Sequence, residues 1–472
     1  MQMKVLLTLP PDPGASFTMP DLGLGYLAAS LQKANLPVNI VDSINESLTL
    51  DELITRIGSI QPDIVGIKFF SKDFYVSHKF LKKIKEIYPE ITTVGGGPHP
   101  SCSDPKDLME QLPDLDYAIR GEAEKSIVTF VKLIRSIRQG EKIDNDMFRN
   151  LPGLIWRMND AVFSNPPDFI ENLDELGFPA WDLLDPHKFV KKFEFSIFTK
   201  PPSVNIIATR GCPYPCSFCA TSLTTGKKVR SRSVSNILEE ISFLLDHYNI
   251  QTINFIDDNF TFHKSFVKAF CEEILKRKMK FEWHCPYGVR LNSLDASIVK
   301  LMEQSGCISI AVGIESGSSR ILDHMKKKLS IDQIREQISM IKKNSKLKIQ
   351  GFFILGYPEE NREDIQKTIL FARSLPLDMA SFSLFCPIPG TPIYEQLVQQ
   401  GKLIEPLKWD DYTMDSVVYA PDGISLEELN KYHRTAYMRF YLRPGVIFNL
   451  ILQMRSTKQI RFLIWGFLHR LL

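Results

Sequence analysis

The chain has 472 residues, a length that corresponds to about three domains at roughly 150 residues each. Hydrophobic residues make up 44% and charged residues 24%, the balance of an ordinary globular protein, which excludes a collagen-like or wholly disordered chain. The net charge is +2, from 57 Lys and Arg against 55 Asp and Glu, so no general basic field indicates a nucleic-acid partner.

Eight cysteines are too few for a disulfide scaffold in a chain of this length. The apolar run at the N-terminus is shorter than the roughly 7–15 residues of a secretory signal. Apolar stretches elsewhere fall short of the ~18 residues that a membrane span needs. We therefore expect a cytoplasmic protein in a reducing compartment.

Strand-like and helix-like segments alternate over the first 135 or so residues. The expected strands are 4–9, 38–41, 63–70, 91–94 and 117–119, and the expected helices are 25–35, 50–60 and 77–87. Such alternation is typical of βαβ units with a parallel sheet, in which ligands bind at the carboxyl ends of the strands. Residues 1–137 are thus expected to form a Rossmann-like domain with polar or glycine-rich turns along one edge.

Residues 138–200 mix charges with prolines and contain one strand-like run, 153–158, so we interpret them as a connector. A second α/β run fills residues 201–400. Its six expected strands are 203–209, 252–256, 281–285, 308–312, 350–355 and 379–384. Strands at this spacing, with helices between them, favour a partial or full β/α barrel, whose sites lie at the C-terminal ends of its strands.

Residues 401–472 are expected to form a helical C-terminal region. From Lys431 onward there are eight Lys or Arg and no Asp or Glu, and the stretches 446–452 and 462–468 are strongly apolar. A basic amphipathic helix can lie on an anionic membrane surface. The alternative is a helix docked on the barrel with a basic outer face.

Three cysteines lie within eight residues, directly after the first expected barrel strand, in the sequence Arg210-Gly-Cys212-Pro-Tyr-Pro-Cys216-Ser-Phe-Cys219. Cysteine thiolates hold [4Fe–4S] clusters, usually in fours, so a loop with three leaves one iron open to an exogenous molecule. A zinc site would need a fourth Cys or His nearby, and the nearest downstream histidine is His247. The other alternative is three unrelated thiols.

The CxxxCxxC spacing at the end of a first barrel strand resembles the radical S-adenosylmethionine (SAM) superfamily. Residues 1–135 resemble the cobalamin-binding domain of the cobalamin-dependent radical SAM family, which includes methyltransferases and the anaerobic Mg-protoporphyrin ester cyclase. Further segments fit this group in order and spacing: Pro10-Pro11, Gly23–Leu27, Gly95–Pro100, Arg120–Glu124, Phe255–Phe260, Gly313–Gly317, Gly351–Glu360 and Pro387–Thr391.

The resemblance implies that the three cysteines ligate a [4Fe–4S] cluster, whose open iron would take the amino nitrogen and carboxylate of SAM. It also implies SAM contacts from Phe218, Asp257, Asp258, Arg290, Glu315, Gly351 and Gly356. Local chemistry leaves alternatives open: Asp257 and Asp258 would also suit a cap on the following helix, and Arg290 a surface ion pair.

For cobalamin, the resemblance implies contacts from Ser71, Gly96, Gly97, His99 and Gly121. Relatives that place a histidine below the cobalt carry DxHxxG in this domain, but residues 1–137 contain no DxH. We therefore expect the dimethylbenzimidazole tail to insert among the strand-end turns without such a histidine. His99 is compatible with three roles: cobalt ligand, hydrogen-bond donor to the corrin amides, or turn residue.

The resemblance implies a cobalamin-dependent radical SAM enzyme, with a [4Fe–4S] cluster, SAM and cobalamin as cofactors, that transfers a methyl group to an unactivated carbon. One alternative is a cobalamin-dependent oxidative cyclisation or rearrangement. Another is a radical SAM enzyme whose N-terminal domain is an interaction module without cobalamin. We expect a small-molecule or lipid-like substrate, an electron donor of the flavodoxin or ferredoxin type, and peripheral membrane contact through the tail as an option.

Overall fold

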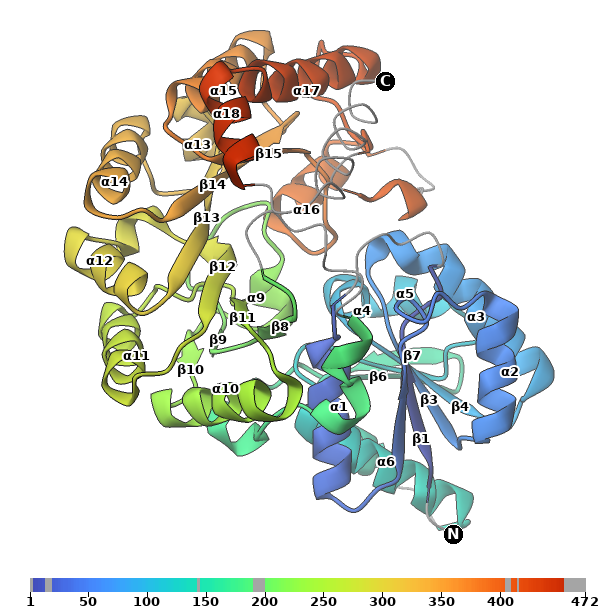
Figure 1. The fold of residues 1–472 in the computed structure, drawn as a ribbon. Helices are drawn as coiled ribbons and strands as arrows, with labels where there is room; N and C mark the ends of the chain where they lie inside the picture. The colour runs from blue at the N-terminus through green and yellow to red at the C-terminus, as the bar shows by residue number, and fades with distance from the viewer. Residues whose placement is uncertain are drawn as a thin grey trace.

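The structure is a computed structural model that describes residues 3–12, 19–141, 145–189, 200–403, 409–413 and 416–453. Two α/β bodies lie side by side (Figure 1). The first is built on a seven-stranded sheet of order β2-β1-β3-β4-β5-β6-β7, and the second on a six-stranded sheet of order β15-β14-β13-β12-β11-β8. This arrangement confirms the predicted α/β fold of a Rossmann-like domain followed by a partial barrel.

The first five strands run parallel, as the alternating pattern predicts: β1 (Val5–Thr8), β2 (Val38–Val41), β3 (Ile64–Lys68), β4 (Thr92–Gly96) and β5 (Tyr117–Ile119). Because β1 stands between β2 and β3, the chain leaves it toward opposite sides, and the switch point of this sheet lies there.

Helices cover both faces of the first sheet. One face carries α1 (Leu22–Lys33) and α6 (Glu124–Arg138), and the other carries α2 (Leu50–Ile60), α3 (Phe74–Ile87) and α5 (Pro105–Gln111). Side chains alternate accordingly along β1, where Val5 and Leu7 join the first core and Leu6 joins the second.

The expected connector contributes to the first sheet. Its strands β6 (Leu154–Met158) and β7 (Ala161–Ser164) form a hairpin that pairs antiparallel with β5. The sheet therefore extends beyond the boundary expected at residue 137. Ile155 and Trp156 are buried, and their pairing covers an edge of β5 that would otherwise be exposed.

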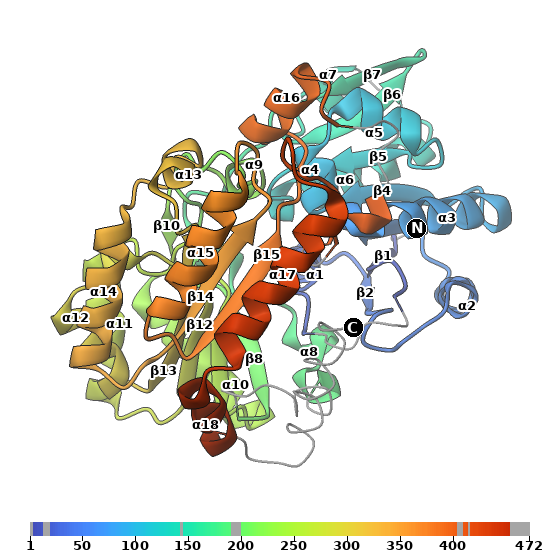
Figure 2. The ribbon, with the colours of Figure 1, turned by 90° about the horizontal axis from the view of Figure 1, so that it is seen from above.

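The six strands of the second sheet are parallel and follow chain order, with β8 and β15 at its two edges: β8 (Ser203–Ile206), β11 (Thr252–Phe255), β12 (Glu282–Val289), β13 (Cys307–Glu315), β14 (Lys348–Leu355) and β15 (Met379–Leu384). The helices between them lie on the outer side of the curved sheet (Figure 2): α10 (Val234–Tyr248), α11 (Lys264–Arg277), α12 (Ala296–Gln304), α14 (Ile331–Asn344) and α15 (Arg362–Ser374).

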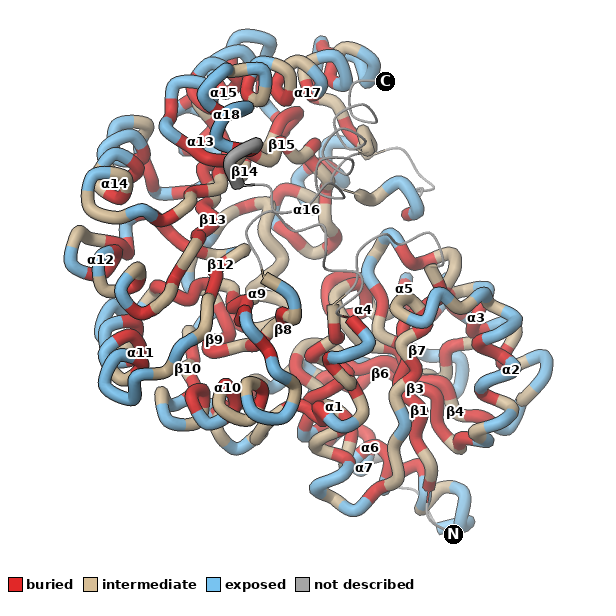
Figure 3. Tube along the Cα trace, in the orientation of Figure 1, coloured by how far each residue is buried: buried red, intermediate tan, exposed pale blue. Residues whose placement is uncertain are grey.

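The buried residues of both bodies concentrate in the strands and on the helix faces turned toward them (Figure 3). In the C-terminal region, α16 (Pro392–Gln399) follows the last strand, and α17 (Leu426–Tyr441) packs on β15 and α15. The helix α18 (Pro444–Gln453) contains the whole first apolar stretch of the tail, 446–452, and the second, 462–468, lies outside the described residues. Within the described ranges, none of the helices is long and apolar enough to span a bilayer.

Candidate active site between the two sheets

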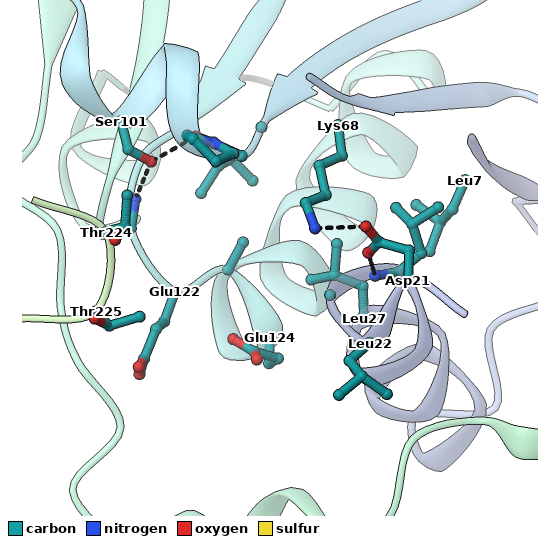
Figure 4. Close-up of a pocket in the computed structure, with 18 of the residues that line it drawn as sticks. Leu7, Asp21, Leu22, Leu27, Lys68, Ser101, Glu122, Glu124, Thr224 and Thr225 are labelled. Atoms are coloured by element: carbon teal, nitrogen blue, oxygen red, sulfur yellow. Dashed lines mark hydrogen bonds and ion pairs between the residues drawn. The ribbon is translucent and has the colours of Figure 1, made fainter. Parts of the chain in front are cut away.

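A cavity of about 560 Å³ lies where the carboxyl ends of the two sheets meet (Figure 4). The first sheet lines it with the ends of β1, β3, β4 and β5, including the switch point. The second sheet lines it with residues at or just beyond the ends of β8 and β11, among them Asn205, Ile207 and Ile256. Both sets of strand ends therefore open onto one space.

The side of the cavity within the first domain suits a flat apolar group. Leu7, Leu24, Leu27 and Ile127 line it, and glycine backbone from β4 and the following turn forms its wall. At Gly97, φ is +94° and an added Cβ would lie 2.7 Å from Cγ of Lys68, so only glycine leaves this cradle open. These residues fit an aromatic base at the end of a cofactor tail.

The cysteine loop runs between β9 (Thr209–Arg210) and α9 (Thr221–Thr224). The amide of Cys212 donates to the carbonyl of Gly226 at 3.1 Å, and that of Cys219 donates to the carbonyl of Cys216 at 3.2 Å. Burial raises the pKa of the Cys212 and Cys219 thiols, and the charges of the neighbouring cysteines raise each pKa further. The three thiols thus share one electrostatic environment.

The donor set of this loop fits an iron–sulfur cluster better than one metal ion. Among the described residues, no three His, Cys, Asp or Glu side chains gather closely enough to hold a single ion. In a cubic cluster each thiolate binds a different iron, so its ligands stand farther apart than those of one zinc ion. Ligation by iron would also offset the burial and the neighbouring charges that raise the pKa of Cys212 and Cys219.

Asp257 and Asp258 hold the backbone that leads into the loop. Asp257 is buried and accepts hydrogen bonds from the amides of Ala208 and Thr209, and burial raises its pKa to about 7. Asp258 accepts from the amide of Gly211 at 3.0 Å. The alternative of a helix cap is wrong for both, because the N-cap of α11 is His263.

The Radical SAM superfamily profile matches residues 206–372, and the B12-binding domain profile matches residues 15–131. The chain is 33% identical to an uncharacterized methyltransferase of Pyrococcus horikoshii, over 94% of each chain. The chain belongs to the cobalamin-dependent radical SAM family. Its cofactors are SAM, a [4Fe–4S] cluster and cobalamin, and methyl transfer is its predicted type of reaction, in agreement with this relative.

Two further comparisons relate this radical SAM enzyme to a cyclase and to a methyltransferase of known structure. It is 27% identical to the anaerobic magnesium-protoporphyrin IX monomethyl ester cyclase of Rubrivivax gelatinosus, over 91% of this chain and 75% of that one. Its fold is similar to that of the radical SAM methyltransferase TsrM from Kitasatospora setae, with a TM-score of 0.67 and 16% identity over 97% of this chain and 92% of that one. The profile match in the first domain argues against an interaction module without cobalamin.

In this radical SAM enzyme, Arg290 is buried rather than paired at the surface, so the expected alternative of a surface ion pair is wrong. Its guanidinium carbon lies 3.4 Å from the ring centroid of Tyr214 in the cysteine loop, and it donates to the carbonyl of Lys327. Its Nε atom has no hydrogen-bond partner in the described part of the chain. An unpartnered buried donor of this kind indicates a ligand with an acceptor oxygen.

Glu315 ends β13 with a positive φ of 69° and accepts from Nζ of Lys327 at 2.6 Å, with both side chains about 10% exposed or less. Phe218 belongs to a different environment, an apolar cluster with Met325 and Tyr357. Glu315 is thus held in a buried ion pair at a strand end, whereas Phe218 packs behind the cysteine loop.

Gly351 in β14 and Gly356 in the turn after it, both predicted to contact SAM, lie where neighbouring residues leave no room for a side chain. A Cβ at Gly351 would lie 2.7 Å from Leu377, and Gly356 adopts a φ of +80° with its Cβ position against Leu429 of α17. Their side-chain directions therefore point to packed residues, which leaves only their backbone groups for a ligand.

Of the residues predicted to contact cobalamin, Gly96, Gly97 and Gly121 line the cavity. Ser71 and His99 stand outside its lining. Nδ1 of His99 lies 2.9 Å from Oγ of Ser71, and the imidazole is buried among aromatic rings, which lowers its pKa to about 4. Of the three roles left open for His99, this packing favours a structural residue of the turn.

The sequence reasoning missed a set of charged residues at the edge of the cavity. Glu122 and Glu124 follow β5, and they pair with Arg210 and Arg230, which flank the cysteine loop. The acidic pair and Arg210 stood in the motifs that carry the family resemblance, but their partners are more than 80 residues away in sequence. The one available signal was the presence of charges at strand ends that are otherwise apolar.

Proposed function

We propose that this enzyme methylates an unactivated carbon of a small molecule that binds beside the cavity between the two sheets. The observation that carries the proposal is the shared cavity, because it brings the glycine turns of the first sheet next to the strand ends of the second and to Arg210 and Thr224, which flank the segment with the three cysteines. When bound, the cluster and SAM supply a hydrogen-abstracting radical, and cobalamin supplies the methyl group.

Each part of the chain has a holding role in this proposal. Cys212, Cys216 and Cys219 hold the cluster, and Asp257 and Asp258 fix the backbone before the loop. The glycine wall of the first sheet lets backbone approach the cobalamin tail.

Arg290 is the proposed partner of the SAM carboxylate. A guanidinium binds a carboxylate through paired N–H donors, and stacking on Tyr214 already fixes the plane of this one. Asp258 lines the cavity and is proposed to face the ammonium of SAM. Glu315 ends β13 and is proposed to stand near the ribose or carboxylate of SAM. Phe218 is proposed to support the SAM site by packing behind the loop, together with the backbone of Gly351 and Gly356.

The substrate is proposed to be small, because the cavity between the two domains has a volume of only about 560 Å³. Tryptophan is the substrate bound in a structure of TsrM, and a porphyrin ester names the cyclase relative. Reductive use of SAM requires an electron source, so we propose an external donor of the flavodoxin or ferredoxin type. The chain would carry out this reaction in the cytoplasm.

The C-terminal region supports a lipid-like substrate met at a membrane surface. In α18, Val446 and Leu450 face the core, whereas Ile447 and Phe448 on its other side are 40% and 61% exposed. The following residues carry Arg and Lys without Asp or Glu. An apolar face next to basic residues is suited to an anionic bilayer.

Anaerobic reconstitution with iron, sulfide, hydroxocobalamin and SAM, followed by mass analysis of products from cell extract, tests the reaction. We expect 5′-deoxyadenosine and a product heavier than its substrate by one CH2. A product formed without that mass gain would instead indicate the oxidative cyclisation of the cyclase relatives. Absence of 5′-deoxyadenosine under reducing conditions would overturn the proposed function.

Sedimentation with liposomes tests the membrane contact. The full chain should bind vesicles with phosphatidylserine and not vesicles of phosphatidylcholine alone, and Phe448→Asp should weaken this binding at least tenfold. Leu370→Asp is the matched control, since Leu370 on α15 is also an exposed apolar residue, at 52%. Equal binding by wild type and Phe448→Asp would refute the contact, as would no binding by either.

A further inference from the structure

A buried cluster of four charged residues joins the two domains at the edge of the cavity. Both carboxylate oxygens of Glu122 accept from the guanidinium of Arg230, each at 2.8 Å. Glu124 lies 2.7 Å from Arg210, which is also 3.4 Å from Glu122. All four side chains are at most 8% exposed. We refer to Glu122, Glu124, Arg210 and Arg230 as the interdomain ion cluster.

Burying four charged side chains between two domains costs free energy. Moving charges out of water costs several kcal/mol per ion, and well-packed apolar residues often serve stability equally well. Ion pairs do fix direction and distance, because a carboxylate and a guanidinium dock in a defined fork geometry. The interdomain ion cluster is therefore better suited to setting a geometry than to adding stability.

The two arginines lead to the start of the cysteine loop and to the end of the helix that follows it. Arg210 is the residue directly before Gly211 and Cys212. Arg230 donates to the carbonyl of Thr225, whose hydroxyl donates to Asp258 at 2.6 Å. Asp258 in turn accepts from the amide of Gly211. The start of the cysteine loop and the end of α9, the helix that follows the loop, are thus tied to the glutamates of the first domain.

The same glutamates face the cavity. Glu122 sits on the turn between β5 and α6, beside Gly121, and Glu124 is the first residue of α6. Both glutamates line the cavity (Figure 4), as does Arg210. The ring of Tyr26, from α1, lies 5.1 Å from the Arg210 guanidinium and holds it from the opposite side. A molecule in the cavity therefore touches the turn that holds the cysteine loop.

We propose that Glu122 and Glu124 are positioning residues that couple cobalamin binding to cluster binding. A cofactor in the cavity restricts the β5–α6 turn, the turn restricts the two arginines, and these restrict the start of the cysteine loop and the end of α9. Coupling between two binding sites is reciprocal, so the cluster must tighten cobalamin binding by the same factor. The inference rests on the proposed placement of cobalamin in this cavity.

The test is an anaerobic absorbance titration of the full chain with hydroxocobalamin, before and after reconstitution of the cluster. We expect the wild-type cluster to lower the Kd of cobalamin by about fivefold or more, the usual lower range for coupled sites. In Glu124→Gln, the two forms should differ by less than about twofold. The electron paramagnetic resonance spectrum of the reduced cluster should shift on cobalamin addition in wild type and stay unchanged in the variant.

A second variant and a matched control separate coupling from stability. Arg210→Lys keeps the buried charge but removes the fork, so it should lose coupling even if Glu124→Gln fails to fold. The control is Asp378→Asn: Asp378 pairs with Lys342, with side chains 8% and 26% exposed, but both residues belong to the second domain and lie outside the cavity lining. This control should keep the full coupling.

The outcomes separate this inference from the proposed function. Equal Kd values for wild type with and without cluster would overturn the coupling while leaving the cobalamin site in place. Full coupling in both Glu124→Gln and Arg210→Lys would overturn the role of the glutamates. Failure of every form to bind cobalamin would instead overturn the proposed site itself.

Discussion

The two sheets are both built from βαβ units, but they leave different surfaces open. Strands β1 and β3 are buried along nearly their whole length, because helices cover both faces of the first sheet. Strands β14 and β15 alternate between buried and half-buried residues, because helices cover only one face. The first sheet can therefore offer a ligand only its strand-end edge, whereas the second offers an inner face and the loops above it.

This difference explains the chemistry of each wall of the site. The edge of the first sheet is narrow, and glycine backbone makes room there for a cofactor tail. The loops of the second sheet carry the three cysteines and Arg290. The first domain thus supplies a slot with Glu122 and Glu124 at its edge, and the second domain supplies the thiols and Arg290.

The largest expected effect is the loss of the cluster from the second domain, with cobalamin binding retained by the first domain. Cys216→Ala should abolish cluster binding and 5′-deoxyadenosine formation, because the two remaining thiolates of this loop cannot ligate three of the four irons of a [4Fe–4S] cluster. Cobalamin should still bind, with at most the weakening that loss of coupling predicts. Iron analysis and product chromatography measure the loss. Cys386→Ala, a cysteine outside the loop, should retain both, and a variant at Cys216 with full iron content would contradict the ligand assignment.

The next effect concerns the contact that fastens the C-terminal region to the first domain. Trp409 is 7% exposed, and its ring packs edge-on against His99 at 5.1 Å. Trp409→Ala should lower the free energy of unfolding by roughly 3–5 kcal/mol, as for other buried tryptophans, and raise the pKa of His99 from about 4 by exposing the ring. Urea unfolding and NMR titration measure the two. Tyr287→Ala, at an exposed ring, should change stability by less than about 0.5 kcal/mol.

A smaller effect is expected when an added side chain fills the glycine-lined slot of the first sheet. Gly96 lines the cavity, and an added Cβ would have no neighbour closer than the Ile119 carbonyl oxygen at 3.7 Å, so the backbone tolerates a side chain there. Gly96→Leu should raise the Kd of cobalamin about tenfold or more, a change of ~1.4 kcal/mol, and leave the cluster intact. Gly96→Ala should stay within about twofold of wild type. Unchanged affinity in Gly96→Leu would place the cofactor elsewhere.

Much of this architecture could be predicted from sequence because it depends on local patterns. The helix at 50–60 has the predicted bounds, since apolar spacing and a capping residue such as Thr49 are local signals. The parallel order of both sheets follows from the alternation of strands and helices.

Features that depend on distant partners could not be predicted in this way. The hairpin of β6 and β7 lies among prolines and charges, and only its pairing with β5 makes it part of the sheet. Lys327 belongs to a run of three lysines that is typical of a solvated surface, yet it is buried against Glu315. Glu122 and Arg230 are 108 residues apart, so their pair has no sequence pattern. Burial of a charge is decided by what the fold brings to it.

The smallest expected effect is a dependence of stability on pH, which comes from one buried carboxyl group of the second domain. Glu360, beyond the end of β14, is buried and accepts from the amides of Gly356 and Tyr357 at 2.7 and 3.1 Å, and burial raises its pKa to about 8. Between pH 4.5 and 8 the folded carboxyl therefore holds a proton that the unfolded chain has lost. Folding takes up this proton, so stability must fall as pH rises through this window, by at most ~1.4 kcal/mol per pH unit.

Glu360→Gln removes this titration and should leave stability less dependent on pH. Urea unfolding at pH 6.5 and 7.2 should show wild type losing about 1 kcal/mol more than the variant between the two values. Glu359→Gln, at the exposed neighbouring residue, should behave as wild type. Equal pH dependence in wild type and Glu360→Gln would mean that the carboxyl is already ionised when folded. The loop after β14 would then hold a buried, ionised carboxylate. The second sheet would thus differ even more from the first, whose strand ends line the cavity with glycine backbone.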